Sequence, residues 1–80
     1  MEYVVIFEKG ENSYGASVPD LPGCIAVAET MEEVRELITE AIEFHIEGLR
    51  EDGDSVPLPS SSLPVQDNPG MSSALIAVQV

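Results

Sequence analysis

The chain has 80 residues, a length that fits one small domain, and its 15 acidic residues against 3 basic ones give a formal net charge of −12. Such a charge repels phosphate backbones, which argues against direct binding to nucleic acid, and the apolar runs are far shorter than the roughly 20 residues that span a bilayer. The single cysteine cannot form an internal disulfide, and no basic segment with a long apolar run opens the chain, so we expect a cytoplasmic protein.

Three short strands are predicted before the middle of the chain. Residues 2–8 are apolar on both faces, which is typical of a central strand. A Gly-Glu-Asn turn at residues 10–12 leads into residues 13–18, where apolar and small side chains alternate as in a half-buried strand. A third strand is expected over residues 24–28.

A stiff corner separates the second strand from the third. Pro19 and Pro22 fix their φ angles and have no N–H to donate. Asp20 can accept hydrogen bonds from nearby amides, and Gly23 permits a positive φ. These residues predict a tight turn that ends one strand and directs the next.

A long helix is predicted from residue 31 to about residue 50 or 51. Thr30 is the expected N-cap because Glu33 follows at the spacing of a capping box, and Gly53 is expected to end the helix in a left-handed conformation. One broad face of this helix is apolar at about 100° per residue and is expected to pack on the sheet. It holds Met31, Val34, Ile38, Ala41, Ile42, His45 and Leu49.

The opposite side of the helix carries a row of glutamates within an arc of roughly 80°. They are Glu32, Glu36, Glu40, Glu43 and Glu47. No lysine lies four residues away to offset their repulsion, which costs about a few tenths of a kcal/mol per pair in an isolated helix. A sequence that keeps this repulsion favours a docking surface for a basic partner, and the predicted partner-binding residues are Glu36, Glu40, Glu43 and Glu47. The alternative is that the charges serve only solubility.

The remaining residues predict a long loop and a last strand. Residues 54–73 are rich in Pro and Ser, and residues 74–80 alternate as a strand. A helix followed by a return to the sheet favours a crossover that makes the last strand parallel to the first. We therefore predict a single α+β domain over residues 1–80, with the order β-β-β-α-β and a small mixed sheet that has one helix packed on a face.

The sequence contains no recognisable catalytic or metal-binding pattern. It has neither a Gly-rich phosphate loop nor a Cys/His zinc spacing. His45 has no cysteine or carboxylate at ligand spacing on its face, so a packed histidine is favoured over a ligand or a base. Cys24 has no predicted base beside it, so a small buried side chain is favoured over a nucleophile. We expect no enzyme activity, no metal and no cofactor.

The order of these features resembles the HicB-like antitoxins of bacterial and archaeal type II toxin–antitoxin pairs. The likeness rests on the hairpin, the P-D-L-P-G-C corner, the E-T helix start and the helix signature E-A-I-E-F-H-I-E-G-L-R-E-D-G of residues 40–53. It covers roughly residues 2–59 and corresponds to the N-terminal domain of the longer family members. The resemblance implies a sheet similar to a truncated ribonuclease-H-type fold.

A ribonuclease-H-type nuclease is nevertheless excluded by the first strand. Such enzymes hold two metal ions with several carboxylates, one of them in the middle of that strand. Here residues 4–7 are wholly apolar, and Glu2 and Glu8 lie only at the ends.

The resemblance implies a non-catalytic antitoxin that binds and neutralises a small, basic, mRNA-cleaving toxin of the HicA type. An acidic surface suits such a partner. Longer family members carry a C-terminal DNA-binding module, whereas residues 60–80 offer a polar loop and one strand, so autorepression by this chain alone is not expected. A small core and an unpaired sheet edge predict a homodimer or a larger homo-oligomer. The alternative function is a stand-alone homo-oligomeric binding module with no cognate toxin.

Overall fold

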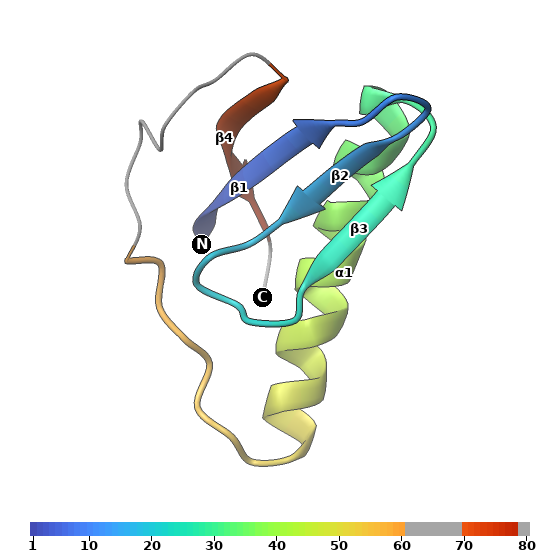
Figure 1. Ribbon diagram of the computed structural model, residues 1–80. Coiled ribbons are helices and arrows are strands. Elements are labelled where there is room, and N and C mark those ends of the chain that lie inside the picture. The colour runs from blue at the N-terminus through green and yellow to red at the C-terminus, as the bar shows by residue number, and fades with distance from the viewer. Residues whose placement is uncertain (61–69, 79–80) are drawn as a thin grey trace.

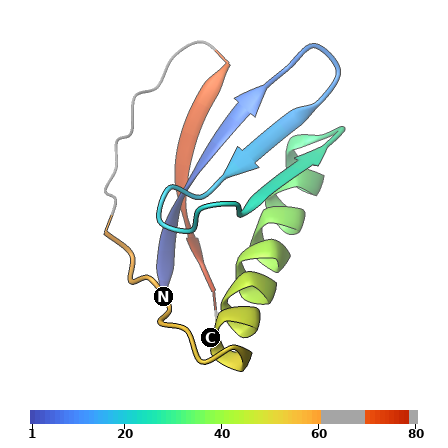
Figure 2. The same cartoon turned by 60° about the horizontal axis from the view of Figure 1, so that its bottom comes forward.

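The computed structural model describes residues 1–60 and 70–78, which form four strands and one helix (Figure 1). The elements are β1 (Glu2–Lys9), β2 (Tyr14–Ser17), β3 (Ile25–Ala28), α1 (Met31–Glu51) and β4 (Met71–Ala77). The strands make one sheet in the order β3-β2-β1-β4, and α1 lies against β2 and β3 on one face (Figure 2). The predicted α+β class, the order of elements and the central place of the first strand are confirmed.

The sheet is antiparallel throughout, so the predicted mixed sheet is wrong. β4 pairs with β1 antiparallel, with Glu2 opposite Ala77 and Glu8 opposite Met71, and the other two ladders are antiparallel as well. The crossover rule assumes that the chain returns directly from the helix to the sheet. Here residues 52–70, at about 3.3 Å each, can span more than the 39 Å length of the molecule. The connection is therefore long enough to reach the C-terminal end of β1, from which β4 runs antiparallel to β1.

The start of β4 is placed by a backbone hydrogen bond. The Lys9 N–H donates to the Gly70 carbonyl oxygen at 2.7 Å, so β4 begins beside the end of β1. Gly70 has φ +87°, a value that favours glycine. β4 thus takes the last three residues of the loop predicted for 54–73, while residues 61–69 of that loop and residues 79 and 80 of the predicted strand lie outside the described residues.

The hydrophobic core lies between α1 and the face of the sheet that α1 covers. Tyr3 and Phe7 of β1 are its largest fully buried side chains. The predicted apolar face of α1 is confirmed at Val34, Ile38 and Ile42, which are fully buried. The prediction left out Ile46, which is only 1% exposed. On the opposite face of the sheet, α1 provides no cover.

The corner and the helix ends form as predicted. In the corner, Leu21 is fully buried and Gly23 has φ +85°. The Thr30 hydroxyl accepts a hydrogen bond from the Glu33 N–H at 3.1 Å, which completes the N-cap. After residue 51, Gly53 adopts φ +74° and ends α1 as expected.

Candidate partner-binding surfaces

The predicted acidic row lies on the solvent side of α1. Glu36, Glu40, Glu43 and Glu47 are all exposed, while the buried residues of α1 point to the sheet. None of the four carboxylates makes an ion pair with another described residue. The row can therefore offer four unneutralised charges to a basic partner. The use of this row as a docking surface stays a prediction.

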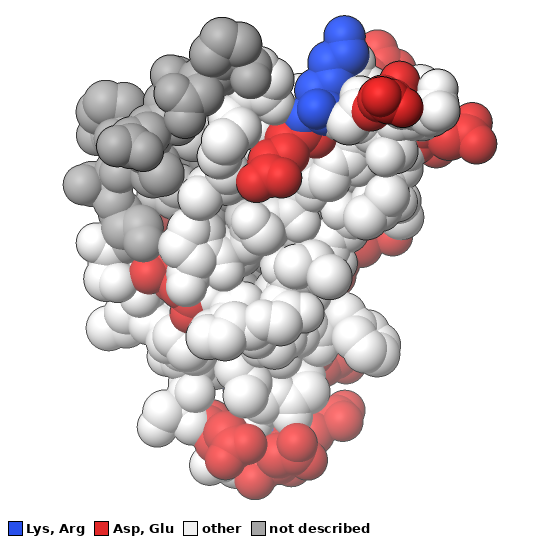
Figure 3. All heavy atoms as spheres, viewed as in Figure 1, with Lys and Arg blue, Asp and Glu red and all other residues white. Residues whose placement is uncertain are grey.

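One of the three basic residues, Arg35, is exposed beside this row and also contacts a core side chain. The Arg35 guanidinium lies 5.5 Å from the centre of the Phe7 ring, within the range of a cation–π contact. Arg35 therefore adds stability across the interface of α1 with β1. Acidic side chains also gather at the C-terminal end of α1, whereas the centre of the face opposite α1 is uncharged (Figure 3).

His45 and Cys24 show no arrangement for chemistry. His45 is half-buried at the side of the packed helix face, and Ile46 takes the central position next to it. Cys24 is 3% exposed and belongs to the core, as predicted, and burial raises the pKa of its thiol. Among residues 1–60 and 70–78, no three His, Cys, Asp or Glu side chains come together as a metal site. No helix in the described part of the chain is long and apolar enough to cross a membrane.

The corner holds the segment that follows α1. The Asp20 carboxylate accepts hydrogen bonds from the Ser60 N–H at 3.0 Å and from the Ser60 hydroxyl at 2.8 Å. The Tyr3 hydroxyl donates to the Pro57 carbonyl oxygen at 2.6 Å. Residues 57–60 are thus tied both to β1 and to the corner, which gives the P-D-L-P-G-C motif a structural role.

An apolar surface around β3 was not predicted from the sequence. Ile25 and Val27 of β3 are 67% and 65% exposed, and Leu37 and Phe44 of α1 are 42% and 77% exposed. The signal was available in part, because Leu37 and Phe44 are seven residues apart and share one side of the helix. Their exposure depends on β3 being an edge strand, which the sequence does not reveal.

Comparison with known proteins places this fold in a family. Residues 3–80 match the family described as HicB_like antitoxin of bacterial toxin–antitoxin system. The chain belongs to the HicB-like antitoxin family. An uncharacterised 14.9 kDa protein of Haemophilus phage HP1 is 44% identical over 57 residues, which cover 71% of this chain and 43% of that protein.

Solved structures agree with this assignment. The crystal structure of the Burkholderia pseudomallei antitoxin HicB is 30% identical, with a TM-score of 0.84 over 100% of this chain and 64% of that one. A chain of the HicA3–HicB3 toxin–antitoxin complex matches over the full length of both with a TM-score of 0.80, but its 23% identity supports the fold only. The chain thus spans less than half of the phage relative and under two thirds of that HicB. The likeness to a ribonuclease-H-type sheet stays a prediction.

Proposed function

We propose that this chain is a non-catalytic antitoxin that binds and neutralises a small, basic, mRNA-cleaving toxin of the HicA type. Membership of the HicB-like family supports the antitoxin role, and a related fold occurs in a complex with HicA3. The observation that carries the docking surface is the exposed, unneutralised row of Glu36, Glu40, Glu43 and Glu47. Charges of this kind steer a basic partner and raise the rate of association.

The proposed antitoxin acts in the cytoplasm by blocking its partner and cleaves nothing itself. Glu2 and Glu8 lie at the ends of β1, on a strand whose middle is apolar, so they cannot bind two metal ions at its centre. The net charge of −12 argues that the chain does not bind nucleic acid directly. We further propose that the chain forms a homodimer or a larger homo-oligomer.

The test of the docking surface is the rate of toxin association for a variant with Gln at the four positions. Stopped-flow mixing of this variant with a small basic toxin of the HicA type should show association slower by about tenfold or more at low salt, with a weaker salt dependence. The matched control replaces four other exposed glutamates with Gln, namely Glu2, Glu8, Glu11 and Glu51. These substitutions remove the same total charge from positions outside the acidic row. Equal rates for the two variants would mean that only the total charge matters.

The alternative function, a stand-alone homo-oligomeric module without a toxin, is favoured by the exposed apolar surface at β3. Inspection of the adjacent reading frames separates the two functions. A small, basic neighbour that co-purifies with this chain supports the antitoxin. A gene that stands alone, in a host that grows normally without it, supports the module.

A further inference from the structure

In the described part of the chain, the outer edge of β3 presents backbone groups that no other strand pairs. The Val18 N–H donates to the Cys24 carbonyl oxygen at 3.3 Å, and Ala16 lies opposite Ala26 two residues further along the ladder. Hydrogen-bonded pairs alternate along an antiparallel ladder, so Ala26 bonds to β2, whereas the N–H and C=O groups of Ile25 and Val27 point away from it. Because β3 ends the sheet, these groups are available to another strand.

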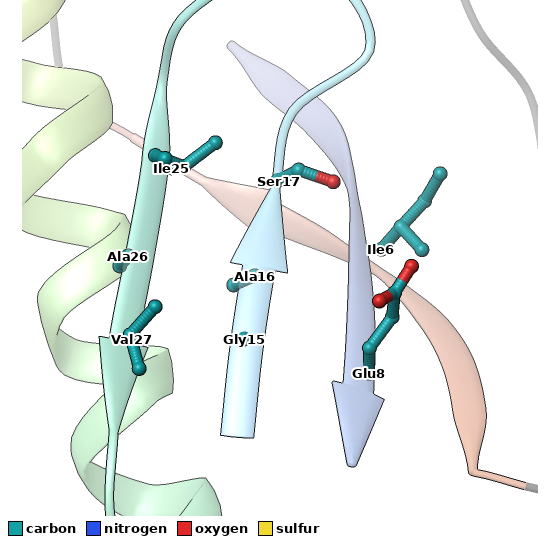
Figure 4. A pocket seen from close by; sticks show the side chains of 8 residues that line it. All are labelled: Ile6, Glu8, Gly15, Ala16, Ser17, Ile25, Ala26 and Val27. Atoms are coloured by element: carbon teal, nitrogen blue, oxygen red, sulfur yellow. The ribbon is translucent and has the colours of Figure 1, made fainter. Parts of the chain in front are cut away.

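Hollows flank β3 on both faces of the sheet. On the face opposite α1, a hollow of about 300 Å³ runs between β1 and β3, with Ile25 and Val27 along its outer side (Figure 4). On the other face, a groove of about 540 Å³ lies between β3 and α1 and includes Leu37, Ala41 and Phe44. A strand added at this edge would lie outside β3, with alternate side chains beside Ile25 and Val27 on one face and beside the helix-side groove on the other.

We propose that the occupant is β3 of a second copy, paired antiparallel about a two-fold axis at Ala26. This register would let Ile25 of one copy and Val27 of the other exchange both of their backbone hydrogen bonds. Their side chains would also pack together as cross-strand pairs on the face opposite α1. The inference rests on the self-association proposed above and names the surface that makes it.

The position of α1 suits this symmetric pairing. α1 lies against β2 and β3, and strands are about 4.8 Å apart, so pairing two β3 strands would place the helix axes roughly 10 Å apart. This is the upper end of the 8–10 Å at which helices commonly pack. The groove that contains Ala26 also contains Glu40 and Ala41. A two-fold axis that passes through Ala26 would therefore relate the two β3 strands and the two α1 helices at once. Leu37 of one copy would then contact Phe44 of the other, with Ala41 allowing a close approach.

The chemistry of the surface favours a second copy over a basic toxin. β3 carries no charge, and among the described residues the helix-side groove is lined by one charged residue, Glu40, and the hollow on the opposite face by one, Glu8. A basic protein would leave its cations without partners on such a surface, whereas a second apolar edge would not. Ile25, Val27, Leu37 and Phe44 together expose roughly 500 Å² per copy, given about 150–250 Å² for each whole side chain. Two copies would bury at most about 1,000 Å² from these residues, which is the lower limit for a specific interface.

The sign of the salt dependence separates this contact from toxin binding. Two copies that each carry a net charge of −12 repel one another, and the two Glu40 carboxylates would lie near the axis. Added salt screens that repulsion, so sedimentation from about 10 μM to about 1 mM should show a dimer that tightens about tenfold as salt rises from about 0.05 M to about 0.5 M. A dimer that weakens with salt would overturn the proposal.

Variants at exposed positions test the surface. Val27→Glu should weaken the dimer by about tenfold or more, because it adds a charge to the paired edge. Glu40→Gln should tighten it. The matched control is Leu75→Glu, at an exposed leucine of β4 on the other edge of the sheet. If Leu75→Glu dissociates the dimer and Val27→Glu does not, the β3 surface is wrong while self-association stands.

A measurement on the parent chain covers the case in which Val27→Glu fails to fold. Hydrogen exchange of the Ile25 and Val27 amides should slow as the protein concentration rises, since dimer formation would hydrogen-bond them. Exchange that is independent of concentration in a chain that does dimerise would overturn the surface. A monomer across the whole concentration range would overturn both the surface and self-association, and would leave toxin binding as a separate proposal.

Discussion

The hydrogen bond from Tyr3 to Pro57 permits a test of how β1 holds the segment after α1. Tyr3 is fully buried, and its hydroxyl reaches the Pro57 carbonyl oxygen at 2.6 Å across 54 residues of sequence. Tyr3→Phe keeps the ring in the core and removes this bond. The free energy of unfolding should fall by about 1–2 kcal/mol, because the Pro57 oxygen loses its partner. For a domain of this size, a loss of 1 kcal/mol lowers Tm by about 4–8 °C.

The effect of Tyr3→Phe should depend on pH with a definite sign. Burial, together with the charge of Asp20, raises the pKa of Tyr3 above its ordinary value of 10.0, and Arg50 opposes this shift. The folded chain therefore keeps a proton that the unfolded chain loses as pH rises past about 10. In that range the parent loses stability, by up to about 1.4 kcal/mol per pH unit from this group, while the phenylalanine variant does not.

Urea unfolding followed by circular dichroism, from pH 8 to pH 11, measures both effects. The parent should be more stable than Tyr3→Phe at pH 8, and the difference should shrink as pH rises. Tyr14→Phe is the matched control, because Tyr14 is only half-buried and its hydroxyl makes no hydrogen bond to another described residue. A difference that is absent at pH 8, or that grows with pH, would refute the reasoning.

Three further predictions concern single side chains. The raised thiol pKa and burial of Cys24 should make its alkylation at pH 8 at least about 100-fold slower in the folded chain than in urea, and similar rates would contradict this. In thermal unfolding, His45→Gln should lower the free energy of unfolding by less than about 1 kcal/mol and Ile46→Ala by about 2–5 kcal/mol, because only Ile46 of the two is fully buried. A larger loss for His45→Gln would disprove the packing described. Asp20→Ala should speed hydrogen exchange at the Ser60 amide, so unchanged exchange would show that this hydrogen bond does not form in solution.

Local features of the fold could be predicted because single residues determine them. Thr30 caps α1 with its own hydroxyl, and Gly53 takes a positive φ that other residues avoid. The direction of β4 is different, because residues 52–70 are long enough to reach either end of β1. Loop length does not choose between the two, so the sequence could not predict the antiparallel pairing of β1 with β4.

The acidic row on α1 could be predicted from the sequence, whereas the apolar surface at β3 could not. The exposed position of the acidic row follows from helical periodicity, since charges opposite an apolar face point to solvent. The apolar surface at β3 does not follow from any local pattern. Ile25 and Val27 would be equally suitable in a buried strand, and they are exposed because β3 is an edge strand and their side chains lie on the face that α1 does not cover. Phe44 is exposed because it lies on the side of α1 that faces past β3, where the sheet has no further strand.

The central place of β1 also determines when the sheet can be completed during synthesis. β1 is made first among these strands, and its hairpin with β2 needs only nearby residues. The other neighbour of β1 is β4, and its pairing brings together residues from the two ends of the described chain, such as Glu2 and Ala77. Contacts so distant in sequence form slowly, and an apolar edge that waits for its partner is exposed to wrong pairing. Until residues 71–77 leave the ribosome, β1 of a nascent chain therefore has one open side that can pair with the wrong strand.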